Sequence, residues 1–479
     1  MKKQSLRTFL SILLALLCVS TVMLCGGCRT EDGGRPADGD TATQAPATQV
    51  PGTQASPETN AADAVTEGET EPAETQPPVL WEPDMGVFNQ GKVVYTKAED
   101  GSISATPTEG NTLGLDVTDR YDLVSICYSV WFDYVLRKSD TGVDSYHDIS
   151  KVLAGEAEWG GSPSFHYWSK PALGYYCSSN REVIRTHMTQ LYTAGVDFII
   201  LDHTNLGYGT IENPVDKVLM VDAPMIALFE TIMEMRAEGL GTPYVVVWCG
   251  SGDQRLYDYL YDNFYGREEW ADCFVYWEGK PFLLTTVLHD ESNPAPDRYT
   301  TRCMGGLLST SATRNGQWNF LAINNAKTST LNAAGEAEQL CVCVASQETY
   351  MSADTAHGRM GGLFWYAQWQ SAFKFRPKFV TLTWWNEWTA QRLYIQGGAY
   401  DGQYHFTDAY SMECSRDIEP MEGGHGDQYY RWMIEYIAAY KNHRECPMLV
   451  EEKYLTEEYS EAVADFLQKF SKGKTVHLQ

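Results

Sequence analysis

The fold is decided by Ala194-Gly195-Val196-Asp197-Phe198-Ile199-Ile200-Leu201-Asp202, where a helix-like segment ends at its glycine and an apolar run follows at once. The segment before it, Asn180–Ala194, comes after two serines that can cap a helix and has apolar residues at helical spacing. Asp222–Glu238 repeats this pattern before a glycine, and the apolar run Pro243–Trp248 follows. Helices that alternate with apolar runs of this kind predict parallel strands joined by crossover helices.

The same alternation continues from Tyr121 onward, and the candidate strands approach the eight that a closed barrel needs. An open doubly wound sheet requires a glycine-rich phosphate turn after its first strand, whereas this chain has Tyr128-Ser129-Val130-Trp131 there. We therefore predict an α/β fold, a (β/α)8 TIM-like barrel over 81–479, with further helices starting near Gln428 and over Thr456–Ser471. The predicted strands are Asp122–Tyr128, Asp197–Asp202, Pro243–Trp248, Asp272–Tyr276, Gln317–Ile323, Cys341–Ser346 and Lys378–Trp384.

The N-terminus has the features of an export signal. Met1-Lys2-Lys3 precedes an apolar stretch, Phe9–Leu24, that is too short and wrongly flanked to span a bilayer. The following Leu24-Cys25-Gly26-Gly27-Cys28 resembles the bacterial lipobox, which implies that residues 1–27 are a lipoprotein signal peptide and that Cys28 is acylated. We expect a protein anchored by lipid to the extracytoplasmic face of the bacterial cell membrane; secretion without a lipid is the alternative.

Composition limits the possible partners. Residues 28–80 are rich in Thr, Pro, Ala and Glu and almost lack large apolar side chains, which predicts a disordered linker. The net charge is −27 and the folded part has no basic run, which argues against binding of nucleic acid. We therefore expect membrane contact only through the lipid anchor. The folded part has no CxxC pair, so free thiols are favoured over a zinc site or a disulfide framework, and we expect a monomer without a metal or other cofactor.

Aromatic and polar side chains gather where the predicted strands end, which is the functional edge of a barrel. With 14 tryptophans and 29 tyrosines, the chain has more aromatic surface than packing usually requires. Rings that stack on sugar faces, together with polar groups that bind hydroxyls, favour a carbohydrate ligand. The candidate binding residues are Tyr128, Trp131, His203, Trp248, Trp277, Glu278, Gln347, Trp385, Asn386, Trp388 and Arg416.

Cleavage of a glycosidic bond uses two carboxyl groups, one protonated and one ionised. Glu387 is flanked by indoles that would raise its pKa, and Asp202 ends an apolar strand. Asp417 and Glu419 follow Arg416 and are further candidates for the second acid. Each also has a structural interpretation: a strand-end hydrogen bond for Asp202, a buried acid bound to main chain for Glu387, and a loop-ordering ion pair for the segment around Arg416.

Four motifs together indicate a family: Gly174-Tyr175-Tyr176-Cys177-Ser178, Ala194–Asp202, Tyr276-Trp277-Glu278-Gly279-Lys280-Pro281, and Trp385-Asn386-Glu387-Trp388 with Ile418-Glu419-Pro420. They resemble the family 99 and family 71-like glycoside hydrolases, from about Tyr121 to Tyr440. The resemblance implies a (β/α)8 barrel; family 99 enzymes are endo-acting α-mannosidases or mannanases without a metal cofactor. Glu387 matches the catalytic glutamate of their Asn-Glu-Trp turn.

The chain departs from this family at Ala390, where the family has its second catalytic glutamate. The mannoside substrate is therefore not carried over. We expect a cell-surface glycoside hydrolase that cleaves a poly- or oligosaccharide with a carboxylate pair. The alternative is a non-catalytic carbohydrate-binding barrel lipoprotein of the cell envelope. A glycosyltransferase is disfavoured because the sequence has neither a nucleotide-phosphate loop nor a metal-binding acidic pair.

Overall fold

The computed structural model describes residues 91–137, 147–159, 161, 164–250, 252–308, 317–322, 329–345, 358–396, 401–406 and 411–455. The chain divides into one unit before Val79 and a second from Val79 to Gln479, and every element described below belongs to the second. The predicted signal peptide, Cys28, the linker, Gln347 and the helix Thr456–Ser471 lie outside the described residues. Among the helices within these ranges, none combines the length and the apolar character that crossing a bilayer demands.

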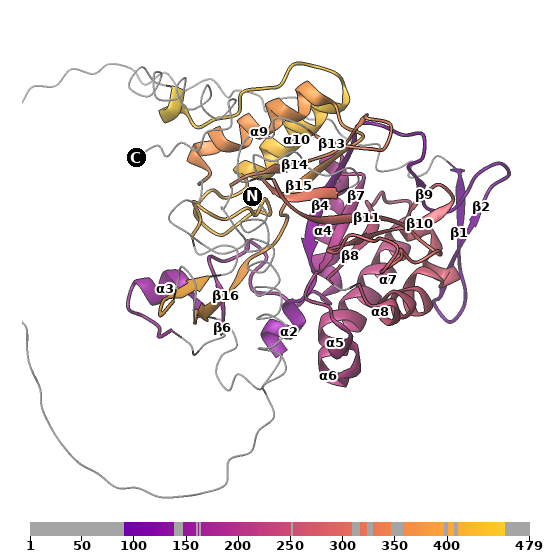
Figure 1. Cartoon of the computed structure of the whole chain (residues 1–479), viewed down its shortest axis with the longest axis horizontal. Coiled ribbons are helices and arrows are strands. Elements are labelled where there is room, and N and C mark those ends of the chain that lie inside the picture. The colour runs from indigo at the N-terminus through magenta and orange to yellow at the C-terminus, as the bar shows by residue number, and fades with distance from the viewer. Residues whose placement is uncertain are drawn as a thin grey trace, which may run out of the picture. The chain divides into compact units, whose positions relative to one another are not determined.

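The centre of the fold is a large, mainly parallel sheet whose eight parallel strands have the order β12-β11-β10-β8-β7-β4-β15-β14 (Figure 1). Neighbours in this order are also successive parallel strands along the chain, except that β15 lies beside β4, the first of them. Strands β4 and β7 are buried along their whole length, which explains their nearly unbroken apolar sequences. The eight strands are β4 (Leu123–Ser129), β7 (Phe198–His203), β8 (Tyr244–Cys249), β10 (Lys280–Thr285), β11 (Thr300–Leu308), β12 (Gln317–Ala322), β14 (Ala337–Cys343) and β15 (Phe379–Thr383).

The two end strands of this series, β12 and β14, contact each other through side chains. The main-chain N–H of Asn319 donates to Gln339 Oε1 over 3.1 Å, and Gln339 Nε2 donates to the Asn319 carbonyl over 2.9 Å. Next to this pair, Trp318 Nε1 donates to Glu338 Oε1 over 2.7 Å. Within the described ranges β12 and β14 are not joined by main-chain hydrogen bonds. The Gln339 side chain instead makes the two hydrogen bonds to Asn319 that a main-chain peptide would make.

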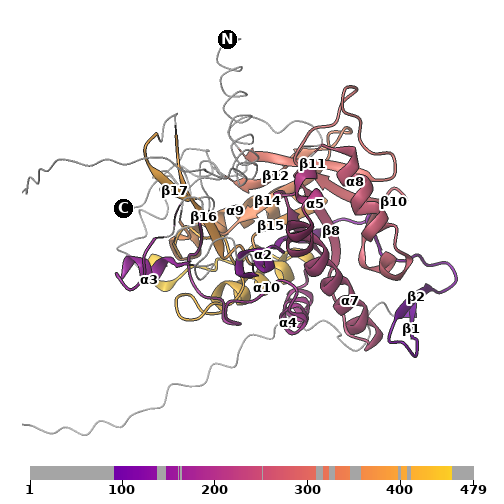
Figure 2. The same ribbon diagram turned by 90° about the horizontal axis from the view of Figure 1, so that it is seen from below.

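Helices cover the large sheet (Figures 1 and 2). Helix α4 begins after Asn180, whose side chain accepts hydrogen bonds from the main-chain N–H groups of Glu182 and Val183, and it is followed by Gly195 at a positive φ of 84°. Helices α9 and α10 pack together through the stacked rings of Trp369 and Tyr436, 5.1 Å apart. The helices are α2 (Phe132–Arg137), α3 (Ile149–Leu153), α4 (Arg181–Thr193), α5 (Tyr208–Glu212), α6 (Pro214–Lys217), α7 (Ala223–Ala237), α8 (Gln254–Leu260), α9 (Leu363–Phe375) and α10 (Gln428–Lys441).

A separate four-stranded sheet, with the order β17-β16-β6-β5, lies to one side of the large sheet (Figures 1 and 2). Strand β16 pairs antiparallel with both β6 and β17. No local pattern in the sequence predicts this small sheet, because its strands come from two segments more than 200 residues apart. The remaining strands are β1 (Val93–Lys97), β2 (Ile103–Pro107), β3 (Leu115–Asp116), β5 (His147–Asp148), β6 (Ser164–Tyr167), β9 (Val275–Trp277), β13 (Thr330–Leu331), β16 (Thr389–Tyr394) and β17 (Tyr404–Phe406).

Six predicted strands are confirmed as β4, β7, β8, β12, β14 and β15, with shifted ends, and the predicted helices correspond to α4, α7 and α10. The predicted strand Asp272–Tyr276 is confirmed only over Val275 and Tyr276, which belong to β9. A short 3-10 helix occupies Glu268–Cys273, and β9 is a short strand antiparallel to β10. A hairpin turn joins β9 to β10, because Trp277 pairs with Lys280 across Glu278 and Gly279.

Candidate active site

Glu387 lies in the turn that follows β15, and this turn is tied to β4. The main-chain N–H of Trp385 donates to the Cys127 carbonyl over 2.8 Å. The Asn386 side chain then bonds both main-chain groups of Ser129, accepting its N–H at 2.8 Å and donating to its carbonyl at 3.2 Å. The side-chain amide of Asn386 bonds β4 as a main-chain peptide would, so the pairing with β4 continues beyond the end of β15. This contact fixes the position of the main chain at Glu387.

The Glu387 carboxylate is ion-paired with Arg416 deep in the protein, where the two side chains are 6% and 1% exposed. The main-chain N–H of Glu387 donates to the Asp417 carboxylate, so neighbouring residues of one segment hold both the side chain and the backbone of Glu387. The sequence predicted an acid enclosed by indoles and protonated. The guanidinium instead favours the ionised form of Glu387.

Asp202 ends β7, where Ser129 of β4 and Trp248 of β8 are its register partners. It is 7% exposed, and its Oδ1 accepts the main-chain N–H of Thr204 over 3.0 Å, so the predicted strand-end hydrogen bond exists. Burial raises the pKa of Asp202, while the hydrogen bonds from Thr204 and the charge of Arg416 act in the opposite direction. The protonated form of Asp202 is thus favoured relative to an ordinary aspartate.

We call Asp202, Glu387 and Arg416 the carboxylate cluster, because Ser129, the register partner of Asp202, is bonded by the side chain of Asn386, the residue before Glu387. Burial raises the pKa of the Cys127 thiol well above its usual value, and the charges of Asp202 and Glu387 both add to this rise. Arg416 acts on the same thiol and on Asp202. The two carboxyl groups therefore lie within electrostatic range of one buried atom of β4, although 185 positions separate them in the sequence.

Aromatic rings adjoin the carboxylate cluster. Trp248 lies 5.1 Å from Phe320 and 6.2 Å from Trp384 between ring centroids, and the Arg416 guanidinium lies 4.9 Å from the Trp384 ring. The indole N–H groups of Trp248 and Trp384 are buried and have no hydrogen-bond partner among the described residues. Two indole donors beside two carboxyl groups are suited to binding hydroxyl groups.

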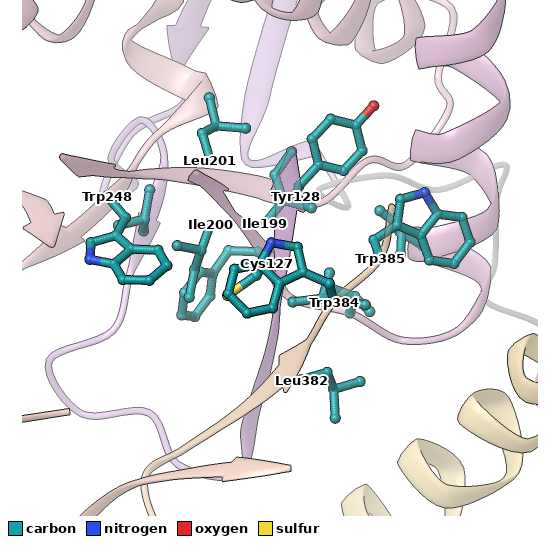
Figure 3. Close-up of a cluster of buried hydrophobic side chains, with 14 of the residues drawn as sticks. Cys127, Tyr128, Ile199, Ile200, Leu201, Trp248, Leu382, Trp384 and Trp385 are labelled. Atoms are coloured by element: carbon teal, nitrogen blue, oxygen red, sulfur yellow. The ribbon is translucent and has the colours of Figure 1, made fainter. Parts of the chain in front are cut away.

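Figure 3 shows that Trp384 and Trp385 point in different directions from the end of β15. Trp385 lies against the helices, 5.6 Å from the His187 ring of α4, and the Tyr128 hydroxyl bonds His187 Nδ1 over 2.8 Å. The structure therefore places Tyr128 and Trp385 on the helix side of the sheet, away from Trp248. Trp384 and Phe320, which were not among the predicted binding residues, lie beside Trp248 instead. The apolar run Gln317–Ile323 was a signal for Phe320 only as a core residue.

Adjacent side chains of a strand point to opposite faces of the sheet, so His203 and Asp202 lie on different faces of β7. Burial lowers the pKa of His203 to about 3, so the ring is neutral at pH 7. It is therefore not a cationic partner for the carboxylate cluster.

Trp277 and Glu278 lie at the edge of the sheet where the parallel strands begin, whereas Asp202 lies near the edge where they end. They come directly before β10, and the Trp277 ring packs 5.2 Å from Phe282 and 5.3 Å from Phe379, near the starts of β10 and β15. Asp202 stands at the opposite, carboxyl edge. Trp277 and Glu278 were predicted to lie with Asp202 at the carboxyl ends of the strands, and this placement was wrong, because β9 turns back from β10 instead of running parallel to it.

Asp417 and Glu419 are completely buried and bound by side chains of the protein itself. Asp417 Oδ2 accepts the Trp168 indole N–H over 2.6 Å, and burial raises the pKa of Asp417 to about 7 against the lowering effect of Arg359, Trp168 and Arg416. The Glu419 carboxylate accepts hydrogen bonds from Tyr176 at 2.6 Å and from Trp388, and its other oxygen pairs with His187 at 2.9 Å.

These contacts favour a structural role for Glu419 and a positioning role for Asp417, which leaves Asp202 as the better partner for Glu387. Trp388 stacks on Trp168 at 4.7 Å, and Trp131 packs 5.4 Å from Phe165 of the small sheet. In the part of the chain that the structure describes, no group of three or more His, Cys, Asp or Glu side chains is arranged to bind a metal. The nine cysteines from Cys127 onward all lie within the described residues and form no disulfide there.

No protein-family model and no curated protein matches the chain. Among solved structures, it is similar to the GH99 endo-α-mannosidase from Bacteroides thetaiotaomicron, with a TM-score of 0.42 and 16% identity over 68% of this chain and 99% of that one. It is also similar to a glycoside hydrolase-like protein, with a TM-score of 0.37 and 12% identity over 69% of this chain and 97% of that one.

Proposed function

We propose that this protein is a glycoside hydrolase that cleaves a poly- or oligosaccharide, with Asp202 and Glu387 as its carboxyl pair. The observation that carries the proposal is the contrast between their surroundings. Glu387 is paired with a guanidinium, whereas Asp202 is buried at a strand end and has a raised pKa. Two carboxyl groups whose environments favour opposite protonation states are the arrangement that glycosidic cleavage uses.

In this mechanism Asp202 donates its proton to the oxygen of the departing sugar as the glycosidic bond breaks. The ionised Glu387 stabilises the positive charge that develops at the anomeric carbon, and it attacks that carbon directly or activates a water molecule. Trp248 and Trp384 bind sugar rings and hydroxyl groups next to the acids. Arg416 keeps Glu387 ionised and in place.

We also propose that the eight parallel strands form a (β/α)8 barrel and that the protein is exported and lipid-anchored at Cys28. The strand order and the Gln339 contact between β12 and β14 support the barrel. The sequence before Cys28 supports the anchor. Metabolic labelling with an alkynyl fatty acid tests the anchor: we expect labelled wild type in the membrane fraction and unlabelled Cys28→Ala protein. Equal labelling of the two would contradict it.

The alternative function is binding of carbohydrate without cleavage. Two observations favour it: Ala390 stands where the similar family has its second catalytic glutamate, and the Glu387 carboxylate is engaged by Arg416. In this alternative the indoles hold a glycan that the protein does not change.

One experiment separates the two functions. The purified chain is incubated with bacterial, fungal and host glycans, and new reducing ends are measured. Release that is lost in Glu387→Gln and retained in Glu422→Gln, an exposed glutamate paired with Lys170, supports the hydrolase. Binding without any product from the whole panel supports the binding protein.

A further inference from the structure

The small sheet presents a row of aromatic side chains on one face. Tyr394 of β16 and Tyr404 of β17 are direct partners in the antiparallel register, so their side chains project to the same face. Their ring centroids are 5.1 Å apart, and the residues are 44% and 47% exposed. The two exposed rings meet edge to face, with an interplanar angle of 61°.

A cation packs against one of the two tyrosine rings. The Arg392 guanidinium lies 3.5 Å from the centroid of the Tyr404 ring and 4.8 Å from that of Trp159. Arg392 is two residues before Tyr394 in β16, so both side chains lie on the same face. Guanidinium stacking on two rings holds them in place before any ligand binds, which lowers the entropy cost of binding.

The row continues toward the carboxylate cluster. Phe406 is the register partner of Arg392, and its ring lies 5.6 Å from Trp159. Strand β16 starts at Thr389, two residues after Glu387. At the other side of the strand pair, the main-chain N–H of Trp168, directly after β6, donates to the Trp388 carbonyl over 3.1 Å. The sheet that carries the rings is therefore built directly onto the turn that holds Glu387.

We propose that the face formed by Trp159, Arg392, Tyr394, Tyr404 and Phe406, here called the aromatic face, binds a neutral polysaccharide outside the carboxylate cluster. This inference rests on the proposed function, since it adds a second contact for the same class of substrate. Exposed tyrosine rings bind the apolar faces of sugar rings. The net charge of −27 disfavours polyanionic glycans, which selects neutral ones.

Binding and cleavage are measured separately with the full chain. Affinity electrophoresis in gels that contain yeast mannan, dextran, laminarin or glucomannan reports binding, with polygalacturonate as the anionic comparison. The variants are Tyr394→Ala/Tyr404→Ala, Tyr394→Phe/Tyr404→Phe, and Tyr121→Ala as a control at another exposed tyrosine. Thermal unfolding of each variant verifies that it is folded.

We expect at least one neutral polysaccharide to retard the wild type, and the double alanine variant to bind it about tenfold more weakly. The double phenylalanine variant should bind as the wild type does, because it keeps both aromatic rings. Tyr121→Ala should also bind as the wild type does, because Tyr121 lies outside the aromatic face. If the double alanine variant loses binding and the wild type cleaves none of the polysaccharides, the result would support binding at the aromatic face and contradict the hydrolase proposal. Undiminished binding and cleavage in that variant would overturn the aromatic face and leave the hydrolase intact, and failure of all four neutral polysaccharides to bind would also overturn it.

Discussion

Arg416 and Glu387 form an ion pair from which solvent is almost entirely excluded, with side chains 1% and 6% exposed. The two residues are 29 positions apart, and the neighbour of Arg416, Asp417, also binds the main chain of Glu387. A buried pair of this kind keeps the carboxylate ionised and limits its movement, and either partner alone would be a costly buried charge.

Replacing Arg416 therefore has a large effect on stability. Arg416→Met leaves the Glu387 charge buried without its partner and is expected to lower the free energy of unfolding by about 3–5 kcal/mol. Urea denaturation measures this change. Arg431→Met is the control, because its pair with Asp427 is 61% and 57% exposed, and it should cost less than about 1 kcal/mol. Equal losses in the two variants would show that the Arg416 pair contributes no more than a surface pair.

Asp202→Asn tests the proposed acid. We expect the rate of reducing-end release to fall by about 10²–10⁴-fold, because the amide cannot donate a proton to the leaving oxygen. The melting temperature should change little, since the amide oxygen can still accept the Thr204 N–H. Asp197→Asn, at the other end of the same strand, removes an ion pair with Lys441 and should retain activity. A marked loss of stability in Asp202→Asn with an unchanged rate per folded molecule would return Asp202 to a structural role.

Asp417 predicts a pH dependence of stability. Burial raises its pKa from 3.8 to about 7, so the folded protein holds this proton more tightly than the unfolded chain does. Its contribution to stability is complete below pH 3.8 and is lost as the pH rises through about 7. In urea titrations, the free energy of unfolding of the wild type should therefore fall relative to that of Asp417→Asn between pH 4.5 and pH 7.5. A difference that is constant, or that grows in favour of the wild type, would contradict this assignment.

Glu419 is expected to matter for stability. Glu419→Gln changes a carboxylate that Tyr176, His187 and Trp388 all contact, and it should lower the free energy of unfolding by about 1–3 kcal/mol because one buried partner loses its acceptor. Activity per folded molecule should remain. Glu422→Gln, three residues away and exposed, serves as the control for denaturant unfolding. An inactive Glu419→Gln protein of normal stability would instead make Glu419 a catalytic candidate again.

The parallel core could be predicted from the sequence because its signal is local. Runs such as Phe198–Leu201 are apolar along their whole length, and a helix with a glycine after it precedes this one. The prediction missed β10 and β11, because the strand that it placed in this region, Asp272–Tyr276, ends before Lys280, where β10 begins.

The site was harder to predict than the core. Asp202 and Glu387 were recognisable as acids at strand ends, but the Arg416 pair, which determines the state of Glu387, depends on how a loop folds back. Trp384 and Trp385 are adjacent and chemically alike, and only the backbone of the turn decides that Trp384 lies beside Trp248. The small sheet joins Ser164–Tyr167 to Thr389–Tyr394, a pairing that no local pattern reveals.

The most direct test of the carboxyl pair is the release of reducing ends from a glycan panel by the wild type, Glu387→Gln and Asp202→Asn, each shown by thermal unfolding to be folded. The account predicts release by the wild type and a loss of at least about a hundredfold in both variants. Release that persists unchanged in folded Glu387→Gln protein would contradict it.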